Sequence, residues 1–323
     1  MNSFLKCLLG TLTGALIAFS AFALLSFKPA NEPEQDSSLV TINRSVSIPK
    51  NISFLDTTIA LSRYDMRERF DREMLSFVYQ HSLTITTIKR ANQYFPRLDT
   101  LLKKYGVPND FKYLALIESS FNVRSVSSVK AAGIWQLMPE TAKELGLEVN
   151  DEVDERYNLE KSTEAACHYF NKAYAKFGSW MAVAASYNAG MGKMQSELCK
   201  QQTCNALDLL LPEETSRYMF RLFAAKELLK DPQKYGFVLK KEDMYQNISC
   251  KNVMVDSTVA DWTIFAKQFG ITYSQLKDFN VWLRSPNLTN KERKTYTIKI
   301  PNKDDFDFDI NKVILYQRNW VQK

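Results

Sequence analysis

The sequence of 323 residues predicts a mainly α-helical protein with a small β-α-α-β module near its C-terminus. Between residues 51 and 235, apolar side chains recur at spacings of three and four, which is typical of one face of a helix. After Gly236, two short alternating runs flank two helical segments, which indicates paired strands around two helices. With only 10 glycines and 10 prolines, the chain is not dominated by turns.

The first segment is apolar and uncharged from Leu8 to Phe27, and a single cation, Lys6, precedes it. This pattern fits either a secretory signal peptide, cleaved after a small residue such as Ala23, or an uncleaved membrane anchor. We therefore assign residues 1–29 to one of these, and either one would export the rest of the chain. The polar residues 30–50 are expected to form a linker.

Residues 51–235 are expected to form an all-α domain without a strand. Pro108 opens a helix at a position where its missing N–H costs little. Asp231-Pro232 stops the last helix. The expected helical segments, named by range, are 108–121, 155–177, 180–189 and 213–229.

Residues 236–302 are expected to form the small module, and residues 303–323 are a tail without an assigned structure. The first strand includes Val253–Val255, and the second covers residues 294–301, where Pro301 closes it. Residues 260–270 and 273–280 are the two helices between them.

Composition excludes several classes of protein. The net charge of +6 is too mild for a nucleic-acid binder. The two histidines, His81 and His168, are far apart, and no CxxC pair exists, so we expect no metal or cofactor. Four cysteines follow the N-terminal segment and allow three pairings, of which a small loop between Cys199 and Cys204 is one.

One carboxylate has an unusual setting. Glu118 ends the segment YLALIESSF, a helix that is almost entirely apolar. Apolar surroundings raise the pKa of a carboxyl group and keep it protonated near neutrality, as a general acid requires. The alternative is a partly exposed glutamate at a helix end.

Two further segments carry polar groups at helix boundaries. In residues 131–147, Gly133 allows a tight turn, Gln136 offers an amide for hydrogen bonds to a ligand, and Pro139 starts a helix. Residues 185–190 place Tyr187 and an amide at a helix end that stops on glycine. Taken alone, these are also compatible with a loop junction, a packed tyrosine and a helix cap.

The order of the motifs resembles the catalytic domain of lytic murein transglycosylases, in the goose-type lysozyme superfamily. The four motifs are Glu118-Ser119, the segment 133–139, the segment 187–190 and the segment 214–218, and the resemblance spans about residues 108–229. It implies a lysozyme-like helical fold with Glu118 as the single catalytic residue. The substrate-binding residues that it implies are Ser119, Ser127, Gly133, Gln136, Met138, Tyr187, Asn188, Ala189, Gly190 and Tyr218.

The resemblance also implies the chemistry. Glu118 would protonate the oxygen between N-acetylmuramic acid and N-acetylglucosamine, then act as base on the C6 hydroxyl, which closes a 1,6-anhydro ring. Glycoside hydrolases normally need a second carboxylate, whereas Glu140 and Glu144 open a helix and are expected to complement its dipole. A goose-lysozyme or chitinase-type hydrolase and a non-catalytic wall-binding protein stay open as alternatives. Trp135 is expected to fill core.

The C-terminal module resembles a LysM domain, which binds N-acetylglucosamine polymers, from about Lys251 to Pro301. Where that family usually has Gly-Asp-Thr-Leu, this chain has Asp256-Ser257-Thr258-Val259, so a structural role is the alternative to glycan binding. The whole arrangement looks like the membrane-bound lytic transglycosylase D group. That likeness implies peptidoglycan strands as the partner and a place in the periplasm or cell envelope, anchored in the membrane if the N-terminal segment is not cleaved.

Overall fold

The computed structural model describes residues 45–55 and 57–322. The expected signal peptide or anchor and most of the expected linker lie outside these residues. From Val46 onward the chain clusters into one compact unit. Within the described part of the chain, no helix is both long and apolar enough to cross a membrane.

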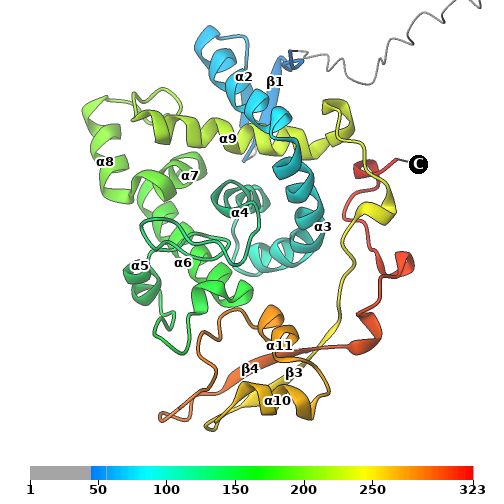
Figure 1. Cartoon of the computed structure of the whole chain (residues 1–323). Helices are drawn as coiled ribbons and strands as arrows, with labels where there is room; N and C mark the ends of the chain where they lie inside the picture. Colours follow the sequence, from blue (N-terminus) through cyan, green and yellow to red (C-terminus); the bar gives the residue numbers. More distant parts are fainter. Residues whose placement is uncertain (1–44, 56, 323) are drawn as a thin grey trace, which may run out of the picture. The chain divides into compact units, whose positions relative to one another are not determined.

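The mainly helical fold is confirmed, and α4 lies at the centre of the helices (Figure 1). Every residue of α4 from Lys112 to Ile117 is buried, as expected for a helix that is almost entirely apolar. The chain enters α4 through a 3-10 turn that follows Pro108. The helices, in chain order, are α2 (Tyr64–Tyr79), α3 (His81–Lys104), α4 (Lys112–Ser119), α5 (Pro139–Glu144), α6 (Leu159–Phe177), α7 (Trp180–Ala189), α8 (Met191–Lys200) and α9 (Glu213–Lys230).

The expectation that this domain contains no strand is wrong. The strands β1 (Asn51–Phe54) and β2 (Thr57–Ala60) pair antiparallel as a hairpin. Phe54 is fully buried, and its ring lies 5.1 Å from that of Phe223 in α9. Each strand has only four residues, which is too short to produce a clear alternation in the sequence. The hairpin covers one side of α9.

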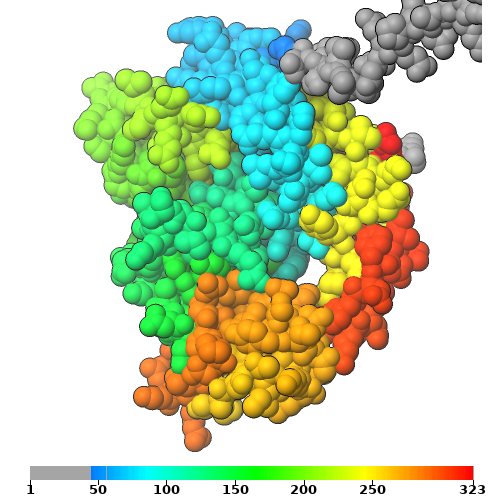
Figure 2. Space-filling view, viewed as in Figure 1, coloured from blue at the N-terminus to red at the C-terminus, as the bar shows by residue number. Residues whose placement is uncertain are grey.

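The β-α-α-β order of the C-terminal module is confirmed. Its elements are β3 (Cys250–Val255), α10 (Trp262–Gln268), α11 (Tyr273–Phe279) and β4 (Tyr296–Pro301). The two strands pair antiparallel, with Cys250 opposite Pro301. The module's buried cluster also takes in Ala132, Val153 and Tyr157 from the helical domain. Figure 2 shows the orange module against the green part of that domain.

The cysteine pairing that the sequence allowed is absent. All four cysteines in the described ranges are free thiols, and those of Cys199 and Cys204 are exposed. Cys199 belongs to the last turn of α8, where its sulfur receives a hydrogen bond from Gln195 at 3.3 Å. Cys167 is buried in α6, and burial raises the pKa of its thiol to about 12, so it behaves as an unreactive core residue.

The tail, which the sequence left unassigned, returns to the helical domain. Figure 1 shows this red segment leaving the module and ending beside the helices. Asn92 of α3 donates a hydrogen bond to the carbonyl of Ile314 at 2.9 Å. Trp320 is fully buried, and its indole N–H donates to the carbonyl of Leu229 at 2.7 Å. The tail is therefore part of the domain's core.

Removal of the Trp320 side chain, which holds the tail against the helices, should destabilise the protein. Trp320→Ala removes a fully buried indole and leaves the carbonyl of Leu229 without its donor, so we expect a loss of about 3–5 kcal/mol in unfolding free energy. Denaturant unfolding measures this loss. Phe308→Ala is the matched control, because Phe308 is 58% exposed on the same tail and should cost under about 0.5 kcal/mol. Equal losses in both variants would contradict this account.

Candidate active site

Glu118 lies in the last turn of α4, where the helix ends abruptly. Ser120 and Phe121 follow it with positive φ angles of 50° and 56°, so the chain leaves the helix at once. The Glu118 side chain keeps some exposure, whereas Ile117 before it is buried. Tyr218, from the second turn of α9, donates a hydrogen bond from its hydroxyl to Glu118 Oε1 at 2.8 Å. The expected late tyrosine therefore contacts the expected acid.

Burial raises the pKa of the Glu118 carboxyl to about 7, because the interior disfavours the charged form. The Tyr218 hydroxyl and the charge of Arg221 oppose this shift, and the negative charge of Glu214 adds to it. At neutral pH the carboxyl is thus protonated in a large fraction of molecules. This is the protonation state that a general acid needs.

Tyr187 connects α7 to the segment that follows α4. Its hydroxyl donates a hydrogen bond to the carbonyl of Trp135 at 2.7 Å. Burial, and next the negative charge of Glu118, raise the pKa of Tyr187 well above its usual value. Tyr187 therefore stays neutral and holds the loop near the acid.

The Gly133–Met138 loop depends on glycine at its first position. Gly133 has φ +77°, and a Cβ there would lie 2.0 Å from the carbonyl oxygen of Arg156. Only glycine fits this close approach. Trp135 is fully buried and donates its indole N–H to Thr163 at 2.9 Å, which confirms that it fills core. Met138 at the end of the loop is 42% exposed.

The Gln136 side chain makes hydrogen bonds within the protein, whereas the sequence predicted an amide that binds a ligand. Its Nε2 donates to the carbonyls of Gly133 at 2.8 Å and Ser125 at 3.2 Å. Both N–H donors therefore hold the chain itself, and the amide oxygen is the atom left for a ligand. Gln136 has φ 48°, an uncommon value for a residue other than glycine.

The two serines also make contacts within the protein. Ser119 Oγ lies within hydrogen-bond distance of the carbonyls of Ala115 (3.1 Å) and Ile134 (3.0 Å), which links the end of α4 to the Gly133–Met138 loop. Ser127 Oγ accepts a hydrogen bond from the Ala131 amide at 3.0 Å, within a turn. Its hydroxyl hydrogen can still be donated to a ligand.

The segment Asn188-Ala189-Gly190 ends α7 beside the start of α9. Gly190 has φ 84° and separates α7 from α8. Asn188 Nδ2 lies 3.5 Å from Glu214 Oε1 in the first turn of α9. Since the charge of Glu214 acts on Glu118, this segment borders the same site.

Sequence reasoning missed Arg221. It donates a hydrogen bond to the carbonyl of Ile117 at 3.2 Å and places its charge near Glu118. Its position three residues after Tyr218, on the same face of α9, is the signal that could have revealed it. Among the residues that the structure describes, no cluster of three or more His, Cys, Asp or Glu side chains could hold a metal ion.

Comparisons with known proteins support the two-part organisation. Residues 99–208 match the transglycosylase SLT domain family, and residues 251–304 match the soluble lytic transglycosylase C-terminal LysM-like domain. The chain is 28% identical over 228 residues to membrane-bound lytic murein transglycosylase D of Escherichia coli K12, which covers 69% of this chain and 49% of the relative. It is 30% identical over 118 residues to a putative tributyltin chloride resistance protein of an Alteromonas species, covering 36% and 57%.

Two solved structures are similar to part of the chain, each at 20% identity and covering 50% of this chain and 30% of the other. They are an inactive mutant of lytic transglycosylase Slt from Pseudomonas aeruginosa, at a TM-score of 0.36, and the 70 kDa soluble lytic transglycosylase of Escherichia coli, at 0.37. The chain spans about half the length of the membrane-bound relative. It thus carries a transglycosylase SLT domain followed by a LysM-like domain, and it is homologous to membrane-bound lytic murein transglycosylase D.

Proposed function

We propose that this chain is a peptidoglycan lytic transglycosylase that cleaves the β-1,4 bond between N-acetylmuramic acid and N-acetylglucosamine. The observation that carries the proposal is the Glu118 carboxyl, with its pKa near 7 and a hydrogen bond from Tyr218. The match to the transglycosylase SLT domain supports the same activity.

The reaction needs a proton donor first and a proton acceptor second. The protonated Glu118 gives its proton to the bridging oxygen, the bond from that oxygen to C1 breaks, and N-acetylglucosamine leaves with a free hydroxyl. The Glu118 carboxylate then takes the proton of the muramoyl C6 hydroxyl, and the C6 oxygen bonds to C1 as a 1,6-anhydro ring. No water is consumed, and Glu118 ends protonated. The Tyr218 hydroxyl stabilises the carboxylate between the two steps.

The substrate would lie between the Gly133–Met138 loop and the junction of α7 with α9. The exposed Met138 offers an apolar contact, and the amide oxygen of Gln136 accepts a hydrogen bond. Asn188 and Gly190 border the same site. Tyr187 and Ser119, whose hydroxyls bond within the chain, shape the site rather than bind substrate directly.

The relative from Escherichia coli is, as its name says, membrane-bound. We propose that this chain likewise works in the cell envelope, with residues 1–29 as its signal peptide or anchor and peptidoglycan strands as its partner.

Mass spectrometry of the released fragments tests the proposal. The full chain, purified in mild detergent and incubated with peptidoglycan, should release fragments that end in 1,6-anhydromuramic acid, one water lighter than hydrolysis products. Glu118→Gln should lower this release roughly 1000-fold, since it removes the proton donor and acceptor. Products with free reducing ends would contradict the proposal, as would full activity of the variant.

Thermal unfolding of Glu118→Gln serves as the control for folding. Because the folded state holds the Glu118 proton up to about pH 7 and an unfolded glutamate releases it near pH 4.5, ionisation destabilises the native protein as pH rises between these values. The uncharged variant should therefore unfold at a higher temperature than the wild type at pH 8. A lower temperature would indicate that activity was lost through misfolding.

The value of kcat/KM should fall as the pH rises above about 7, because Glu118 then loses the proton that it must donate. Tyr218→Phe removes a hydrogen bond that favours the ionised carboxylate, so it should raise the pKa of Glu118 and move this fall to higher pH. We also expect kcat/KM of Tyr218→Phe, at its optimal pH, to be roughly tenfold lower than that of the wild type.

Tyr169→Phe is the matched control for this pH profile. The Tyr169 hydroxyl donates to the carbonyl of Ser186 at 2.8 Å and does not bond to Glu118. Removal of the Tyr169 hydroxyl should leave the pH dependence of kcat/KM unchanged. A fall that moves to lower pH in Tyr218→Phe would refute the role of this hydrogen bond.

A further inference from the structure

The Gly133–Met138 loop holds a conformation that its own residues disfavour. Gln136 has a positive φ of 48°, and Lys130, just before the loop, has a positive φ of 66°. Conformations of this kind cost about 1–3 kcal/mol and persist only when surrounding contacts hold them. Contacts from outside the loop are therefore needed to keep it in place.

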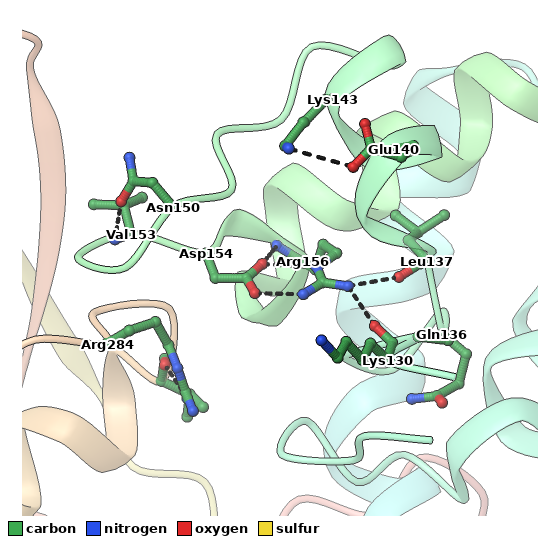
Figure 3. Close-up of polar contacts among 12 residues, drawn as sticks. Lys130, Gln136, Leu137, Glu140, Lys143, Asn150, Val153, Asp154, Arg156 and Arg284 are labelled. Atoms are coloured by element: carbon green, nitrogen blue, oxygen red, sulfur yellow. Dashed lines mark hydrogen bonds and ion pairs between the residues drawn. The ribbon is translucent and has the colours of Figure 1, made fainter. Parts of the chain in front are cut away.

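Arg156 supplies those contacts from a buried position. Its Nη1 donates to the carbonyl of Lys130 at 2.7 Å and to that of Leu137, the residue directly after Gln136, at 3.1 Å (Figure 3). The backbone oxygen of Arg156 is the atom that a Cβ on Gly133 would meet. Arg156 thus contacts residues 130–137 at their beginning, middle and end.

Asp154 orients the Arg156 guanidinium. Its two carboxylate oxygens accept from Nε at 2.9 Å and Nη2 at 2.7 Å, an arrangement that fixes the plane of the guanidinium. Both side chains are less than 10% exposed. If the two side chains separated, each would leave an uncompensated charge in the interior, which is strongly unfavourable. The pair therefore keeps its geometry.

The segment that carries this pair is attached to the LysM-like module. The Asp154 amide donates to the carbonyl of Trp282 at 2.8 Å, and the Arg284 amide donates to the carbonyl of Glu152 at 2.8 Å. The Arg284 guanidinium lies 4.4 Å from the ring centre of Tyr157. The contacts therefore run from the module, through residues 152–157, to the Gly133–Met138 loop.

We infer that Arg156 is a positioning residue that couples the docked LysM-like module to the substrate loop of the transglycosylase site. This inference rests on the proposed function. The module acts on the reaction through its contact with residues 152–157. When that contact loosens, the Gly133–Met138 loop becomes mobile and substrate binds less tightly.

The coupling predicts a specific kinetic pattern. The contacts described for Arg156 do not include Glu118, so the chemical step should keep its rate and its pH dependence. Loosening a loop that binds substrate raises KM instead. A merely structural role would reduce the amount of folded enzyme, which lowers the apparent kcat and leaves KM unchanged.

Two variants test the inference, each in the full chain. Arg156→Lys keeps the charge opposite Asp154, but an ammonium cannot reproduce the planar fork that joins a carboxylate to two carbonyls. Arg284→Ala changes an exposed residue of the module, so it should fold even if Arg156→Lys does not. The matched control is Asp278→Ala, which removes an exposed ion pair between the module and Arg124 and leaves the Arg156 contacts intact.

On soluble peptidoglycan fragments, KM should rise about tenfold in Arg156→Lys and about threefold in Arg284→Ala, with kcat within about twofold. Asp278→Ala should match the wild type. Unchanged KM with lowered kcat would overturn the inference. An effect of Arg156→Lys without any effect of Arg284→Ala would overturn the coupling to the module.

Amide hydrogen exchange gives a second readout that needs no activity. Exchange in residues 130–137 should accelerate in both variants and stay at the wild-type rate in Asp278→Ala. If the wild type releases no anhydro products, the proposed function fails, whereas exchange still decides whether Arg156 and the module hold the loop. Unchanged exchange in both variants would overturn the inference even in an active enzyme.

Discussion

The burial of one carboxyl group, Glu118, is the constraint on which the rest of this structure depends. A glutamate with its pKa near 7 in place of 4.5 carries a cost of about 3 kcal/mol once it ionises. The cost arises because α4 is buried from Lys112 to Ile117, directly before the acid. The Tyr218 hydroxyl offsets part of it with one hydrogen bond of 2.8 Å.

The surrounding core accounts for the rigidity of this arrangement. The β1–β2 hairpin packs on α9, which carries Tyr218, and Trp320 of the tail also bonds to the end of α9. On the opposite side, the LysM-like module shares buried residues with the segment behind the Gly133–Met138 loop. Parts of the chain that are far apart in sequence thus fix the two sides of one site.

Much of the helical fold could be predicted from sequence because its signals are local. The segment 180–189 was predicted with its exact bounds, since Ser179 caps its start and Gly190 ends it. The hairpin was missed because its strands are short, and the tail because Trp320 finds its partner, Leu229, 91 positions away. No local pattern carries that information.

The candidate site, too, could be predicted where its signals are local and not where they depend on distant contacts. The apolar segment around Glu118 predicted a raised pKa, and the predicted tyrosine does contact the acid. The role of Gln136 was less predictable, since its amide donors hold backbone carbonyls. Asp154 and Arg156 resemble an ordinary polar surface loop in sequence. Both side chains are buried, and the Arg156 guanidinium bonds to the carbonyls of Lys130 and Leu137, about 20 positions or more away, which a local pattern does not reveal.

The most direct test of this account is the titration of the Glu118 side-chain carboxyl by carbon-13 NMR. The resonance is assigned by its absence from the spectrum of Glu118→Gln. The account predicts a midpoint at about pH 7 in the folded protein. A midpoint near 4.5, the ordinary value for a solvated glutamate, would contradict it, because the group would then be ionised where a general acid must be protonated.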